Sequence, residues 1–161
     1  MCCSIDQKSE WCRKCPVFEK CAESVFLFLG QAATDTVGGW ASILHMGTHE
    51  KTLSGFHYDV GENDDRTALI GFISTLKAFK STTKIYVFTT SEYLWSGIVD
   101  GYVDRKGKNQ SLWAECHQYS RVHDMSVCLV RLDENPKVID ESIRDRLKKC
   151  KSMALQCLYS G

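Results

Sequence analysis

The sequence predicts an α/β fold in which a mixed β-sheet is flanked by helices. Three observations lead to this prediction. Apolar runs of strand length alternate with segments whose apolar residues recur at helical spacing. The first half holds three strand-like runs separated by short polar turns, which indicates antiparallel pairing. In the second half a helical segment connects two strand-like runs, which indicates parallel pairing.

Three strands open the predicted sheet. Residues 24–30 (SVFLFLG) form a continuous apolar run. A second run, residues 39–46 (GWASILHM), ends at Gly47, and a third, residues 52–60 (TLSGFHYDV), follows after a few polar residues. We expect these runs to form an antiparallel meander.

A helix follows over residues 67–79. Its apolar residues recur at helical spacing: Leu69, Ile70, Ile73, Leu76 and Phe79. Asp64 or Asp65 is placed to cap its start.

The remaining elements are a strand, two helices, a strand and a final amphipathic helix rich in Lys and Arg. They span residues 84–90, 92–103, 109–120, 125–132 and 139–158. The complete order is therefore β-β-β-α-β-α-α-β-α, without internal repeats.

Composition restricts the function classes. A length of 161 residues suits one domain, and we separate a cysteine-rich segment, residues 1–23, from the domain proper, residues 24–161. Twenty basic residues balance twenty acidic ones, so no overall field attracts nucleic acid or an acidic membrane. No stretch approaches the roughly 20 apolar residues of a membrane span. We expect an intracellular protein, cytoplasmic or nuclear.

The N-terminal cysteines form a candidate metal site. Cys12, Cys15 and Cys21, with Cys3 or its neighbour Cys2 upstream, offer four thiolates for a tetrahedral Zn²⁺. The phrase CRKCPVFEKC also resembles the cluster-binding segment of WhiB-type iron-sulfur proteins. Free thiols, or S-acylation of Cys2 and Cys3, are the other interpretations.

The other thiols and the imidazoles are not assigned to chemistry. Cys116, Cys128, Cys150 and Cys157 fall in predicted helices and strands, where a free cysteine is ordinarily a small buried apolar residue. None of the five histidines is assigned to catalysis.

Four segments in this order resemble the ribonuclease H family over about residues 25–155. They read GGWASILHMG, ENDDRTALIGFISTLKAF, IYVFTTSEYLWSGI and SLWAECHQY. The resemblance implies a ribonuclease H-like fold, a mixed five-stranded sheet flanked by helices.

The resemblance also implies a site of four carboxylates that hold two Mg²⁺ ions. Here the first three positions fall on Gly30, Ala68 and Thr90, and only the fourth stays acidic, as Asp145. We therefore expect no catalytic Mg²⁺ and a pseudoenzyme. The alternative is a shifted set drawn from nearby acids: Asp35, Asp59, Glu62, Asp64, Asp65, Glu92 and Asp133.

Nucleic-acid contacts implied by the resemblance are altered too. Two amides that touch RNA become Asp64 and Asp65, and the small residue after the first acid becomes Gln31. The remaining candidate contacts are basic residues of one loop and of the last helix: Arg105, Lys106, Lys108, Arg144, Arg146, Lys148, Lys149 and Lys151. A solvated helix face explains the helical group equally well.

Three functions follow as hypotheses. The first is an inactive domain that serves protein–protein association or assembly with a partner that the sequence does not identify, in a viral, retroelement or RNA-processing system. The second is a protein that binds nucleic acid weakly without cleaving it. The third is a metal-dependent nuclease with relocated ligands.

Overall fold

A computed structural model describes residues 24–58, 64–104, 107–133 and 140–160. Five strands form one sheet in the order β3-β2-β1-β4-β5. The strands are β1 (Val25–Ala33), β2 (Val37–Met46), β3 (His49–Tyr58), β4 (Lys84–Thr89) and β5 (Asp124–Leu129). The helices are α2 (Asp64–Leu76), α3 (Glu92–Val99), α4 (Gln110–Ser120) and α5 (Glu141–Ser160). The predicted fold class and element order are confirmed.

The first three strands form the expected meander. β1 pairs antiparallel with β2, and β2 with β3, whose register extends from Met46↔His49 to Val37↔Tyr58. β3 begins three residues before the predicted strand, because a tight turn at Gly47 (φ 63°) lets polar residues join an edge strand. An apolar pattern does not reveal such residues. Residues 59 and 60 of the predicted strand lie outside the described part of the chain.

The last two strands run parallel to β1. β1 pairs with β4 from Val25↔Ile85 to Leu29↔Thr89, and β4 pairs with β5. Helices cover both faces of this region, so β1 is buried over eight of its nine residues. That explains why its sequence is a continuous apolar run.

Helix α3 is shorter than its pattern predicts. The Ser91 side chain accepts a hydrogen bond from the Leu94 N–H at 3.1 Å and so caps the first turn. The helix ends at Val99, because Gly101 (φ 92°) and Tyr102 (φ 66°) adopt left-handed conformations that stop it.

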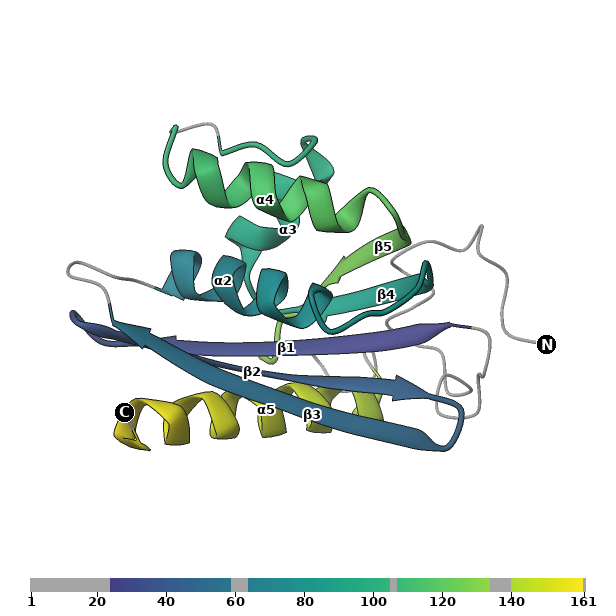
Figure 1. The fold of residues 1–161 in the computed structure, drawn as a ribbon. Helices are drawn as coiled ribbons and strands as arrows, with labels where there is room; N and C mark the ends of the chain where they lie inside the picture. The colour runs from purple at the N-terminus through teal and green to yellow at the C-terminus, as the bar shows by residue number, and fades with distance from the viewer. Residues whose placement is uncertain (1–23, 59–63, 105–106, 134–139, 161) are drawn as a thin grey trace.

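The two faces of the sheet carry different layers (Figure 1). Helices α2, α3 and α4 lie on one face, and α5 lies on the other. Alternate residues of β1 follow this division: Leu27 and Leu29 join the core under α2, whereas Phe26 and Phe28 join the core under α5. Among the described helices, none is long and apolar enough to cross a membrane.

Candidate functional site

The structure brings three of the predicted site positions to one edge of the sheet. Gly30 and Thr90 directly follow the last β1–β4 pair, Leu29↔Thr89. Ala68 is fully buried in the first turns of α2, beside the same end of β1. We call this region, marked by Gly30, Ala68 and Thr90, the β1–β4 edge.

Helix α5 closes the space beside Gly30. A Cβ atom added there would lie 2.5 Å from the Cys150 carbonyl carbon and 2.6 Å from the Lys151 nitrogen. Both are backbone atoms, so no side-chain rotation relieves the overlap. Burial raises the pKa of the Cys150 thiol to about 12, so this neighbour is a neutral group.

The fourth predicted position lies elsewhere. Asp145 is exposed on α5, more than one turn before Cys150, the α5 side chain that lies closest to Gly30. Among the described residues, no group of three or more His, Cys, Asp or Glu is arranged to hold a metal ion. Two Mg²⁺ ions therefore do not fit at Gly30, Ala68 and Thr90, since these side chains supply no carboxylate.

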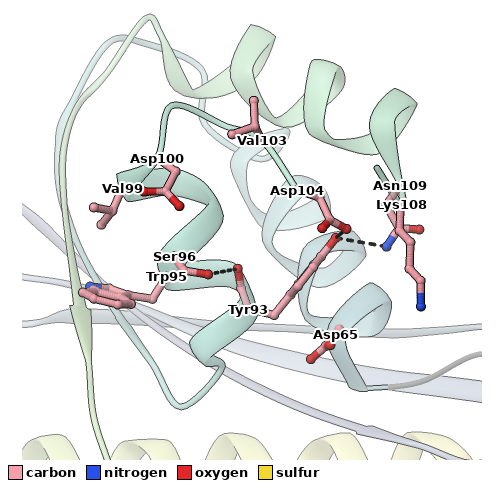
Figure 2. A pocket seen from close by; sticks show the side chains of 10 residues that line it. All are labelled: Asp65, Tyr93, Trp95, Ser96, Val99, Asp100, Val103, Asp104, Lys108 and Asn109. Atoms are coloured by element: carbon pink, nitrogen blue, oxygen red, sulfur yellow. Dashed lines mark hydrogen bonds between the residues drawn. The ribbon is translucent and has the colours of Figure 1, made fainter. Parts of the chain in front are cut away.

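A pocket of about 400 Å³ opens between α3, the loop after it and the starts of α2 and α4 (Figure 2). Its lining combines three aspartates, one lysine and two aromatic rings. These residues are Asp65, Asp100, Asp104, Lys108, Tyr93 and Trp95. The lining is acidic overall, so the pocket by itself does not favour a phosphate.

Tyr93 organises one wall of the pocket. Its hydroxyl donates to Asp104 Oδ2 at 2.8 Å, and accepts from Trp113 Nε1 at 2.8 Å and from Asn109 Nδ2 at 3.1 Å. Arg66 Nη1 donates to Asn109 Oδ1 at 2.8 Å and extends the network to α2. Burial raises the pKa of Tyr93 further above its ordinary value of 10.0, so its hydroxyl is protonated at neutral pH and donates to Asp104.

The sequence did not predict this network. Asn109 precedes α4, where an asparagine ordinarily caps the helix, yet it makes no capping bond and adopts a left-handed conformation (φ 57°). Its side chain bonds Arg66 and Tyr93 instead. No local pattern relates these three residues, because they come from three different segments.

The predicted basic contacts are spread over several regions. Lys108 lines the pocket, Lys148 is exposed on α5 and Arg144 is half-buried there. Arg105 and Lys106 lie outside the described residues.

The predicted zinc ligands also lie outside the described residues: Cys3, Cys12, Cys15 and Cys21. The zinc site, and the division of the chain at residue 23, therefore stay predictions. Cys116, Cys128 and Cys150 are buried as predicted, and Cys157 is half-buried.

Relatives of known name identify the family. The chain is 31% identical over 116 residues to a ribonuclease H of Hydrogenovibrio crunogenus, a match that covers 63% of this chain and 79% of the relative. The chain belongs to the ribonuclease H family. A ribonuclease H of Acetivibrio thermocellus is 33% identical over 98 residues, 53% of this chain and 65% of that protein. A comparison with models of protein families finds no match.

Solved ribonuclease H structures share the fold. RNase H1 of Halobacterium salinarum is similar at a TM-score of 0.63 and 12% identity, over 86% of this chain and 99% of that one. LC11-RNase H1, solved in complex with an RNA/DNA hybrid, is similar at a TM-score of 0.55 and 11% identity, over 78% of this chain and 98% of that one. At such identities the likeness shows the fold alone.

Family membership corrects one prediction. We expected a pseudoenzyme, and this is wrong: relatives at 31–33% identity are named ribonuclease H, so the chain belongs to a family of enzymes. The absence of carboxylates at Gly30, Ala68 and Thr90 does not by itself establish a loss of activity.

Proposed function

We propose that this chain binds double-stranded nucleic acid, with an RNA/DNA hybrid as the first candidate, at the β1–β4 edge. The observation that carries the proposal is the placement of Gly30, Thr90 and the first turns of α2 at one edge of a ribonuclease H sheet. Membership in the family, and the similar fold of LC11-RNase H1 in its hybrid complex, support the choice of ligand.

Binding at this edge has an electrostatic cost. Asp64 and Asp65 are exposed in the first turn of α2, and Asp65 also lines the acidic pocket. Carboxylates repel backbone phosphates. We therefore expect weak binding that falls about ten- to fortyfold between 50 and 200 mM salt, as for two or three phosphate contacts.

The test compares a labelled RNA/DNA hybrid with DNA and RNA duplexes at these two salt concentrations. Changing Asp64→Asn and Asp65→Asn removes both charges and should raise hybrid affinity several-fold. The matched control, Asp124→Asn with Glu141→Gln, removes two exposed charges elsewhere and should leave affinity unchanged. A wild-type chain that retains no duplex at 50 mM salt would overturn the proposal.

Hydrolysis is measured in the same samples with Mg²⁺ and with Mn²⁺, since the family is one of enzymes. Cleavage that disappears in Asp65→Asn but persists in the control would support a relocated carboxylate in the reaction. The expected role in protein–protein association stays a prediction, because the relatives compared above are named for ribonuclease H alone.

A further inference from the structure

Lys151 places a positive charge beside the end of β1. Its Nζ donates to the backbone carbonyl of Gln31 at 2.8 Å. That carbonyl lies two residues beyond the last β1–β4 pair, Leu29↔Thr89, so β4 does not supply its partner. The bond holds a flexible lysine side chain at the β1–β4 edge.

Lys151 differs from the other cations near this edge in the groups that surround its charge. No carboxylate of the described residues forms an ion pair with Lys151, which bonds a neutral carbonyl. Arg131 instead lies 3.8 Å from Glu92, and Lys108 shares its pocket with three aspartates. Lys151 is also exposed, so an anion can approach it.

Gln31 itself carries an unmet polar group. The residue is only 7% exposed, and its Oε1 has no hydrogen-bond partner among the described residues. Buried polar atoms are ordinarily bonded, and exceptions often mark places where a ligand or water completes the site. Because side chains alternate along β1, this side chain lies on the α2 face with Leu29, whereas Lys151 reaches the Gln31 backbone carbonyl from α5, so the unmet atom is a separate polar feature of the same edge.

We propose that Lys151 is a phosphate-contacting residue: its ammonium group, held on the Gln31 carbonyl, binds a backbone phosphate of the duplex. The proposal rests on the function proposed above and names the charged group that acts at this edge. A lysine ammonium binds phosphate as a point charge. This contact between lysine and phosphate does not require a carboxylate at the Gly30 position.

The test measures hybrid affinity over a series of salt concentrations for Lys151→Gln and Lys151→Arg. Glutamine keeps an N–H donor for the Gln31 carbonyl but removes the charge. We expect Lys151→Gln to weaken hybrid binding about three- to tenfold at low salt, and to reduce the slope of log K against log salt by about one. Lys151→Arg should restore both, and thermal melting should be unchanged.

Lys80→Gln is the matched control. Lys80 is exposed after α2, away from the β1–β4 edge, and its loss should leave affinity and slope unchanged. If the wild type binds the hybrid and Lys151→Gln binds it with the same affinity, the inference about Lys151 is overturned, but the proposed function is not. Affinity loss that accompanies a lower melting temperature, without rescue by arginine, would overturn it in favour of a structural role. Absence of any duplex binding by the wild type would overturn both proposals.

Discussion

The two faces of the sheet differ in how much room they leave at the β1–β4 edge. Under α5, aromatic rings of β1 and β4 stack, with Phe28 and Phe88 centroids 5.1 Å apart, and the helix backbone rests against Gly30. On the opposite face, α3 and the start of α4 leave a pocket lined by polar side chains around Tyr93. The α5 face is filled to the backbone at Gly30, whereas the opposite face leaves a pocket.

The contrast shows where a site can be built in this chain. A packed face tolerates no added atoms, because close-packed backbone cannot move aside for a side chain. An open, hydrogen-bonded face tolerates added groups but depends on every partner in its network. Three substitutions test this contrast, and each is compared with a matched substitution that has a small expected effect.

The largest effect is expected for Gly30→Asp, on the closed face. The new Cβ would overlap the Cys150 carbonyl carbon at 2.5 Å, and the carboxylate would be buried among apolar groups. We expect a loss of at least about 4 kcal/mol in the free energy of unfolding, measured by urea denaturation.

Thr90→Asp is the comparison for that experiment. Thr90 is half-buried at the same edge, so an added carboxylate can reach water, and we expect a change below about 1 kcal/mol. Equal stability of the Gly30→Asp and wild-type proteins would contradict the closed face described here.

An intermediate effect is expected for Tyr93→Phe, on the open face. The change leaves the buried Trp113 Nε1 and the Asn109 amide without their shared acceptor. An unmet buried donor costs about 1–3 kcal/mol, so the same denaturation measurement should show a loss of that size. Tyr159→Phe, at a residue that is 86% exposed, should change nothing measurable.

The smallest effect is expected for Glu50→Gln, at the rim between β3 and α5. Glu50 Oε1 accepts from Arg146 Nε at 2.9 Å and from His45 Nδ1 at 3.0 Å. Burial opposes ionisation of Glu50, yet these two hydrogen bonds hold its pKa below the usual 4.5. Because the carboxyl is partly solvated, we expect a loss below about 1 kcal/mol at pH 7.

The pH dependence gives the sign of that contribution. A pKa that is lowered in the folded state stabilises the protein above about pH 4.5, and the stabilisation is lost as the pH falls through the lowered pKa. The free energies of unfolding of the wild type and Glu50→Gln should therefore become equal in acid. Urea denaturation at pH 7 and below pH 4 measures both. A difference in the free energy of unfolding that stays the same at both pH values would show that ionisation of Glu50 does not contribute to stability. Glu92→Gln, in a long and exposed ion pair, is the control.

The sequence alone determined the order and type of the described elements. The apolar run of β1 and the helical spacing in α2 are local patterns, and such patterns report directly which faces of an element are buried. The family resemblance, and the positions Gly30, Ala68 and Thr90, were also readable, because they lie within contiguous matching segments. The pseudoenzyme that we inferred from these positions was a wrong prediction, because the chain belongs to a family of enzymes.

Tertiary structure alone decided what surrounds those positions. Lys151 meets Gln31 across 120 residues, and Trp113 meets Tyr93 across 20. Nothing local encodes such pairs, since they depend on how α5 and α3 pack against the sheet. Gly30 illustrates the limit: the resemblance implies a carboxylate at this position, and only the packed α5 backbone shows that the space beside Gly30 is filled.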